Sequence, residues 1–274
     1  MFQVLLVATL TGGATAVGAF PFLMVREIGR STYDTLLGFG AGLMLAAATL
    51  GLLPAALRET HDHDVLRPDR LALVIVGFVL GALILFFLDR LIPHQHAGGH
   101  HHHMHEAPES DEHSDCNHRS VDERARHHGL LILGAMSLHR LPEGFAIGAG
   151  FATAEYRALG ILLTVATALQ NAIEGAIMAA PLKKGGFSAG RLFVSVAATG
   201  LAIPVAAVCG YLFSQQIPTA MPLTLALAAG ALIYLTCSEI IPESHSHGHE
   251  RRATVGVLSG FLLIIIVKTL VGRD

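Results

Sequence analysis

Long apolar stretches separated by short polar segments run along almost the whole chain. A helix needs about 20 mostly apolar residues to cross the hydrocarbon core of a bilayer. Eight stretches meet this length, and a membrane-spanning helix is predicted in each. Their ranges are 2–24, 35–57, 71–92, 129–153, 158–181, 190–213, 220–241 and 253–272. The pattern therefore predicts an all-α polytopic membrane protein with eight transmembrane helices.

Composition agrees with this interpretation. Hydrophobic residues make up 52% of the 274 residues and charged residues only 14%, whereas soluble domains contain about 25% charged residues. The lipid bilayer is the expected partner, and no basic stripe indicates binding to nucleic acid. The apolar segments are rich in Gly and Ala, which allows close helix packing and permits a homodimer. The three cysteines have no CxxC spacing, so Cys209 and Cys237 are expected to be small buried residues.

Lysine and arginine are distributed unevenly between the two sets of loops. The first, third, fifth and seventh loops with their borders hold 11 of the 18, and the opposite side with the termini holds 6. The positive-inside rule then places these four loops in the cytoplasm and both termini outside. The predicted location is the inner (plasma) membrane of the cell, as a multi-pass protein.

One spacing of glycine and proline occurs twice. Gly42 precedes Pro54 by the same 12 residues that separate Gly230 from Pro242. Because the second and seventh helices would run in opposite directions, the match indicates an inverted repeat of helices 1–3 and 6–8, with two helices between them (3+2+3). Such repeats are typical of transporters with a site near the membrane midplane. A coincidence of two residues is the alternative.

The segment 93–128 is polar and contains 11 of the 17 histidines. Its composition predicts a disordered cytoplasmic loop that separates 1–92, with helices one to three, from 129–274, with helices four to eight. Neutral imidazole is a common zinc ligand, so a metal-buffering or sensing role is one interpretation and a solvated linker is the other. The densest candidate ligands are His100, His101, His102, His103 and His105.

Polar motifs lie in the middle of two apolar segments. Residues 139–144 read His-Arg-Leu-Pro-Glu-Gly, and residues 170–175 read Gln-Asn-Ala-Ile-Glu-Gly. An ionisable residue inside a membrane segment is costly and marks a candidate functional site.

Residues four apart share one face of a helix, which pairs His139 with Glu143 and Gln170 with Glu174. Two such helices in contact would present an imidazole, two carboxylates and an amide oxygen, a ligand set that suits zinc. The alternative is a buried polar network that only stabilises the bundle, with Arg140 paired to Glu143.

These motifs resemble those of the ZIP (Zrt-, Irt-like) family of divalent-metal transporters, in a bacterial form, and the resemblance covers essentially the whole chain. Six residues match the family's motifs in the fourth and fifth helices: His139, Pro142, Glu143, Gly144, Glu174 and Gly175. The resemblance implies a carrier that moves Zn²⁺, and also Cd²⁺, Fe²⁺ or Mn²⁺, into the cytoplasm. The metal would be the substrate, and no catalytic cofactor is expected.

The chain departs from the family at a second metal position. Many members hold two metals bridged by the two glutamates, whereas this chain has Arg140, Asn171 and Ile203 at the positions of the second-metal ligands. A guanidinium has no lone pair for a cation and keeps its charge. One metal per site is therefore predicted, with Arg140 as a fixed positive charge. The predicted ligands are His139, Glu143, Gln170 and Glu174.

Two further residues are weaker candidates. Met44 on the second helix is a soft ligand or an ordinary core methionine. The resemblance suggests Glu239, near the inner end of the seventh helix, as an exit ligand, and an interfacial charge is the alternative. Other functions are an intramembrane zinc-dependent hydrolase, which would lack a HExxH motif, and a metal sensor or exporter. The central motifs favour a transporter over an enzyme.

Overall fold

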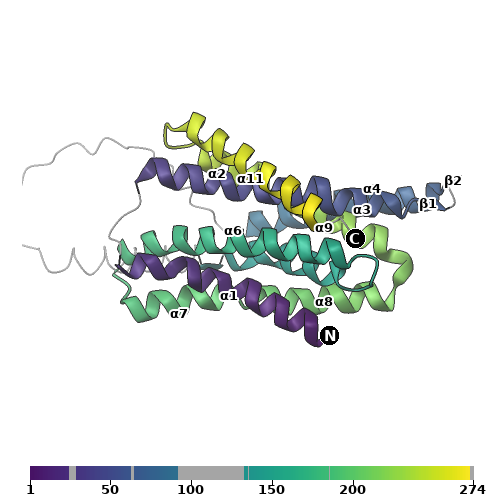
Figure 1. Ribbon diagram of the computed structural model, residues 1–274, viewed down its shortest axis with the longest axis horizontal. Coiled ribbons are helices and arrows are strands. Elements are labelled where there is room, and N and C mark those ends of the chain that lie inside the picture. The colour runs from purple at the N-terminus through teal and green to yellow at the C-terminus, as the bar shows by residue number, and fades with distance from the viewer. Residues whose placement is uncertain (25–28, 63–64, 92–132, 135, 185, 272–274) are drawn as a thin grey trace, which may run out of the picture.

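The computed structural model describes residues 1–24, 29–62, 65–91, 133–134, 136–184 and 186–271. Over these ranges the chain runs eight times along a helical bundle (Figure 1), and seven of the helices are long and apolar enough to cross a membrane. The first half contains α1 (Phe2–Met24), α2 (Arg30–Ala46), a π-helical segment (Ala47–Leu52), α3 (Leu53–Arg58), the short strands β1 (His61–Asp62) and β2 (Val65–Leu66), and α4 (Pro68–Leu91).

The second half begins with a helix over 133–134 and 136–150. It continues with α6 (Arg157–Lys184), α7 (Ala189–Thr199), α8 (Ala202–Gln216), a 3₁₀ turn (Pro218–Ala220), α9 (Met221–Leu235), a second π-helical segment (Thr236–Ile240), α10 (Ile241–Ser244) and α11 (Glu250–Val271). The predicted polytopic all-α fold is confirmed. The His-rich loop 93–128, with its candidate ligands at 100–105, lies outside the described residues.

The sixth predicted segment, 190–213, differs from expectation because it forms two helices rather than one. The α7 helix ends at Thr199, and α8 begins at Ala202. Pro204 has no N–H to donate to the carbonyl of Gly200, four residues earlier, so a continuous α-helix is interrupted there.

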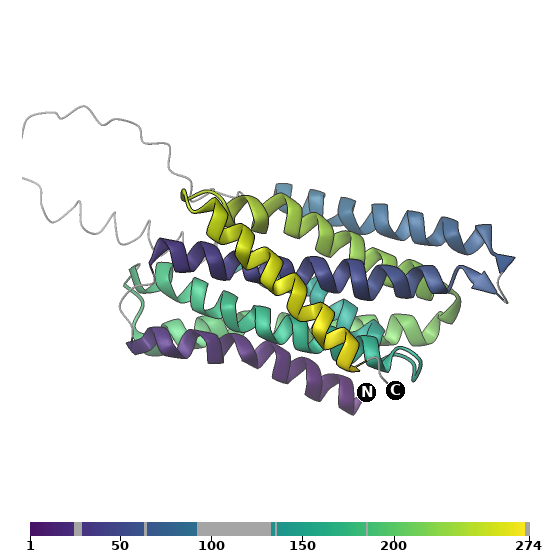
Figure 2. The ribbon, with the colours of Figure 1, turned by 45° about the horizontal axis from the view of Figure 1, so that its top comes forward.

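The two ends of the bundle are distinct. One end, termed the terminal end, carries the start of α1, the strands β1 and β2, residues 151–156 and the end of α11 (Figures 1 and 2). The opposite end, termed the loop end, carries the end of α1, the end of α4 and the α10–α11 connection. The chain therefore reverses direction at each passage, as the predicted sidedness requires.

The helices form two groups. In the first group α1 packs against α6, α7 and α8, and the helix over 136–150 packs against α8 through Gly144 and Gly148. In the second group α11 packs along α2, and α4 packs along α9. Contacts of α6 with α2 and α11 join the groups, and α11 crosses α2 obliquely (Figure 2).

Glycine contacts repeat in the two halves of the chain. A Cβ on Gly77 of α4 would collide with the carbonyl oxygen of Leu223 in α9, and a Cβ on Gly256 of α11 would collide with that of Thr35 in α2. Small residues allow membrane helices to approach this closely. Four pairs of equivalent residues have the same separation in the sequence: Gly12 with Gly200, Thr35 with Leu223, Gly42 with Gly230, and Pro54 with Pro242.

Both halves also interrupt an α-helix in the same way. A π-helical segment precedes Pro54 in one half and Pro242 in the other. The N–H of Leu53 bonds to the carbonyl of Ala48, and the equivalent N–H of Ile241 bonds to that of Thr236. Isolated π-turns are uncommon and frequently mark functional sites. Together with the glycine contacts they confirm the inverted repeat that two residues indicated in the sequence.

Both cysteines expected to be buried are exposed on the outside of the bundle, so that expectation was wrong for Cys209 and Cys237. The outer surface of a bundle of apolar helices faces hydrocarbon, where a small apolar side chain is as stable as in the core.

Gly18 provides a test of the helix contacts. Its Cβ would collide with the carbonyl oxygen of Ala172 in α6, whereas Gly13 on the same helix has no atom within 4 Å of its Cβ position. Gly18→Ala is expected to destabilise the protein by about 1–3 kcal/mol through overpacking. Gly13→Ala should instead stabilise it by up to about 1 kcal/mol, because alanine favours a helix interior more than glycine does. Thermal unfolding in detergent, followed by size-exclusion chromatography, measures the difference. Equal melting temperatures for the two variants would contradict the close packing of α1 on α6.

Candidate metal centre

Glu143 and Glu174 lie on two neighbouring helices, the helix over 136–150 and α6, and both side chains are buried. Each glutamate is followed by a glycine. A Cβ on Gly144 would collide with the carbonyl oxygen of Ile203 in α8, and a Cβ on Gly175 would collide with that of Thr15 in α1. The Glu-Gly pairs therefore combine a carboxylate with a glycine that lets the next helix pack closely, which explains why both motifs end in the same dipeptide.

Gln170 joins the two carboxylates. Its Nε2 donates hydrogen bonds to Oε1 of Glu143 at 3.1 Å and to Oε1 of Glu174 at 2.8 Å. Three of the four predicted ligands thus meet at one point. The other oxygen of Glu143, Oε2, is buried and accepts no hydrogen bond, although a buried polar atom is normally paired.

Arg140 is fully buried beside this point. Its Nη2 lies 3.3 Å from Oε2 of Glu174, and its Nη1 donates to the hydroxyl of Thr15 at 2.7 Å. The guanidinium therefore pairs with the carboxylate of α6, and not with Glu143 one turn further along its own helix as the network interpretation of the sequence supposed. Its Nε is buried and unpaired.

Asn171 and Ile203, which the sequence places with Arg140 at the expected second-metal positions, lie against neighbouring helices. Asn171 is fully buried and donates from Nδ2 to the backbone carbonyl of Thr11 at 3.1 Å, while its Oδ1 is buried without a partner. Ile203 is fully buried, and its backbone packs against Gly144. Neither side chain adds a carboxylate to the site.

His139 faces a third helix segment. Its Nε2 lies 3.1 Å from Oε2 of Glu239, which belongs to the π-helical segment Thr236–Ile240, and both side chains are partly exposed. The fourth predicted ligand and the predicted exit ligand therefore contact each other, one helical turn from Glu143 towards the loop end.

Met44 is buried in the core, where its sulfur accepts a hydrogen bond from the hydroxyl of Thr236 at 3.7 Å. Thr236 also donates to the carbonyl of Leu232. This contact links the second helix to the second π-helical segment, a role compatible with ordinary core packing.

Thr11 and Thr15 on α1 contact the site residues but were missed from the sequence. They share one face of α1, and both are buried. The available signal was their spacing of four residues beside Gly12 and Gly18 in an otherwise apolar helix. That signal is weak, because threonine commonly bonds its own helix, as Thr11 does to the carbonyl of Val7.

The site holds two carboxylates and one guanidinium, so it has an excess of one negative charge when all three are ionised. Within the described part of the chain, no three His, Cys, Asp or Glu groups are gathered in a metal-binding arrangement. The Nε2 of Gln170 lies between the two carboxylates. A divalent cation here would gain two carboxylates in a dry environment, where charge interactions are strong.

Comparison with known proteins identifies the family of the chain. The family model described as "ZIP Zinc transporter" matches residues 2–268. The chain is 38% identical to the zinc transporter ZIPB of Bordetella bronchiseptica, over 94% of this chain and 78% of that protein. It is 32% identical to the zinc transporter GufA of Myxococcus xanthus, over 98% of both chains, and 28% identical to the human zinc transporter ZIP11, over 97% and 96%. These relatives are named as transporters and not as enzymes, and the chain belongs to the ZIP zinc transporter family.

Proposed function

We propose that this chain carries Zn²⁺ into the cytoplasm through a single-metal site between the helix over 136–150 and α6. The proposed ligands are His139, Glu143, Gln170 and Glu174. Zinc accepts nitrogen and carboxylate oxygen ligands, usually four. The metal is the substrate of the carrier, and no catalytic cofactor is proposed.

The observation that carries the proposal is the amide of Gln170 between two buried carboxylates. Its Nε2 donates to both glutamates, so a partial positive charge stands where a cation would balance them. If the amide turned by 180°, it would present its carbonyl oxygen to an incoming ion. The unpaired Oε2 of Glu143 offers a further lone pair at the same place. Most buried polar atoms in folded proteins are paired, so an unpaired carboxylate oxygen beside a second carboxylate favours a bound cation over packing alone.

Arg140 supports the choice of one metal over two. It is held by Glu174 and Thr15, beside the two carboxylates that bridge a metal pair in other family members. A guanidinium there supplies a permanent charge and excludes a second cation. Asn171 and Ile203 add no carboxylate to compensate.

The contact between His139 and Glu239 supports a path towards the loop end. Both side chains are partly exposed, unlike the two central glutamates. An ion that left the two central glutamates would still be held by the imidazole of His139 and would next meet the carboxylate of Glu239, and both groups are zinc ligands. We therefore keep Glu239 as the proposed exit ligand, and Met44 as a packing residue with at most a weak contact to the metal.

The loop end is proposed as the cytoplasmic side. Lysine and arginine are more numerous in the loops at this end than at the terminal end, which fits the positive-inside rule. The termini would then lie outside, the protein would span the inner (plasma) membrane, and the loop 93–128 would buffer or sense metal in the cytoplasm. Cd²⁺, Fe²⁺ and Mn²⁺ are proposed as further substrates, because mixed nitrogen and oxygen ligands suit several such ions.

Zinc uptake into proteoliposomes tests the proposal. Purified protein is reconstituted with an internal zinc-sensitive dye, and the wild type is compared with a variant that lacks residues 97–118. We expect uptake by both, within about twofold of each other, because the transported ion is bound inside the membrane and a polar loop adds only weak external sites. Binding of zinc without uptake by the wild type would instead indicate a sensor. Loss of uptake on deletion of the loop would contradict a site confined to the membrane helices.

A further inference from the structure

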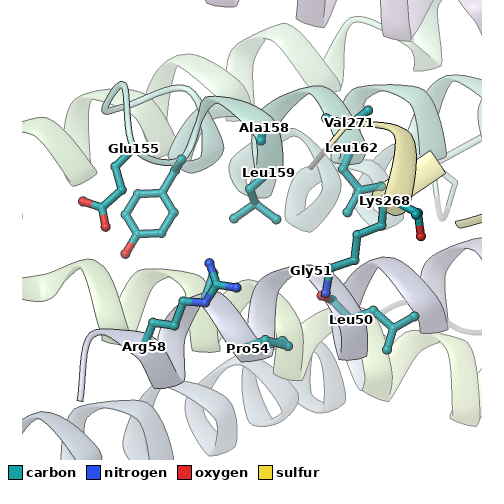
Figure 3. Close-up of a pocket in the computed structure, with 13 residues that line it drawn as sticks. Leu50, Gly51, Pro54, Arg58, Glu155, Ala158, Leu159, Leu162, Lys268 and Val271 are labelled. Atoms are coloured by element: carbon teal, nitrogen blue, oxygen red, sulfur yellow. The ribbon is translucent and has the colours of Figure 1, made fainter. Parts of the chain in front are cut away.

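A pocket of about 480 Å³ opens between the two helix groups near the terminal end. Figure 3 shows its lining, which comes from the junction of the first π-helical segment (Ala47–Leu52) with α3, from residues 155–162, and from the end of α11. Leu162 lines the pocket and lies on α6, about two helical turns before Gln170. The pocket therefore lies between the terminal end and the level of the proposed metal site along α6.

Two basic side chains extend into this pocket. Lys268 of α11 is exposed, and its ammonium donates to the backbone carbonyl of Leu50 at 2.6 Å. In a regular α-helix the N–H of residue 54 would bond to the carbonyl of Leu50, but Pro54 has no N–H. The Lys268 ammonium therefore bonds to a carbonyl oxygen that the proline leaves available. Arg58 lines the same pocket, opposite a single carboxylate, Glu155 (Figure 3).

The nearby carboxylate of Glu59 is already engaged. It accepts a hydrogen bond from Tyr156 and lies 3.8 Å from Nη1 of Arg70. Burial, followed by this hydrogen bond, raises the pKa of Tyr156, so the phenol stays protonated as a donor. Positive charge consequently predominates among the charged groups that line the pocket.

The inverted repeat shows that this charge is specific to one end. The spacing that relates Pro54 to Pro242 also relates Gly51 to Glu239. At the loop end the π-helical segment thus carries a carboxylate beside His139, whereas the equivalent segment at the terminal end carries a glycine and a carbonyl covered by the Lys268 ammonium. The carboxylate of one half is therefore replaced in the other by a glycine, with an ammonium from α11 on the neighbouring carbonyl.

We propose that Lys268 controls the entry of divalent cations from the terminal end: its tethered ammonium occupies the Leu50 carbonyl and repels cations from the pocket. The inference rests on the proposed function, because it takes the pocket as the outer mouth of the zinc path. Lys268 acts on access and does not ligate the ion in the central site. Its removal therefore changes the concentration dependence of uptake and leaves equilibrium binding at the central site unchanged.

Initial rates of zinc uptake test this inference. We expect Lys268→Met to lower the KM for Zn²⁺ about three- to tenfold at low ionic strength, as the repulsion of a divalent ion by one charge several ångströms away predicts. The shift should largely vanish in about 0.5 M salt, because exposed charges are screened over a few ångströms. Lys268→Arg, which keeps the charge, and Arg157→Met, which removes a charge at the same end outside the pocket, should behave as wild type. An unchanged KM for Lys268→Met, or a salt-independent shift, would overturn the inference.

A second measurement does not depend on transport. Ala158, which lines the pocket and is exposed, is changed to cysteine in a variant whose native cysteines are replaced by serine. Its reaction rates with a trimethylammonium-bearing and a sulfonate-bearing methanethiosulfonate are then compared. Lys268→Met should raise the ratio of cationic to anionic rates at least threefold, and an unchanged ratio would refute the repulsion. A raised ratio in a protein that takes up no zinc would reject the proposed function and leave the charge assignment intact.

Discussion

Replacement of Glu174 by glutamine is expected to reduce zinc uptake at least 100-fold, to the level of empty liposomes. The change keeps the volume of the side chain but removes one of the two carboxylates that Gln170 joins. It also leaves the buried guanidinium of Arg140 without its carboxylate partner. A divalent ion entering the site would then meet one negative and one positive side chain, so most of its electrostatic stabilisation would be lost.

Uptake into dye-loaded proteoliposomes measures this effect, with protein amount and monodispersity checked for each variant. Glu250→Gln is the matched control, because Glu250 is an exposed glutamate at the start of α11 and lies far along the chain from both motifs. It should transport as wild type. Uptake by Glu174→Gln at more than a tenth of the wild-type rate would show that zinc crosses the membrane without this carboxylate.

Replacement of Arg140 by methionine is expected to tighten zinc binding about tenfold or more. A fixed positive charge beside a cation site disfavours the bound ion, and Arg140 stands within 3.3 Å of a proposed ligand, Glu174. Tighter binding would slow release, so the maximal rate of uptake should fall while the KM falls with it. Arg140→Lys keeps the charge and should bind zinc within a few-fold of wild type.

The same variant should be less stable when zinc is absent. Removal of one partner from a buried ion pair costs about 3–5 kcal/mol, because the other charge remains buried and unpaired. Zinc would then restore stability, since ligand binding to the folded state stabilises it. Titration calorimetry and thermal unfolding, each with and without zinc, give both values. Zinc affinity that is unchanged or weaker in Arg140→Met would contradict the role of Arg140 as a repelling charge.

Much of the fold could be predicted because the bilayer imposes a length. Where the structure describes them, the helix ends lie within a few residues of the predicted ranges. The larger differences arise where polar residues extend a helix, as Arg30 to Asp34 do at the start of α2. The inverted repeat was visible only through Gly42, Pro54 and their counterparts. The glycine contacts that establish it were hidden, because the chain contains 29 glycines and only the rotation of each helix decides which of them meet a neighbour.

The central site was predictable in part from the regular spacing of side chains on a helix. A spacing of four residues places Gln170 and Glu174 on one face, and a matching face on the preceding helix brings Glu143 to them. The ion-pair partner of Arg140 could not be predicted from the sequence. Glu143 on the same helix was an equally reasonable partner, and the observed pair with Glu174 depends on how α1 and α6 pack around that helix. The contact of His139 with Glu239 required the position of a third helix. The burial of the cysteines was mispredicted because a membrane protein has an apolar exterior as well as an apolar core.

The most direct test of a single-metal site is anomalous diffraction at the zinc absorption edge from crystals of the full chain grown with zinc. We expect one zinc peak within the membrane helices, about 2.0–2.2 Å from carboxylate oxygens of Glu143 and Glu174, with the guanidinium of Arg140 beside it in place of a second ion. Two peaks bridged by these glutamates, or no peak between the two helices, would contradict the account.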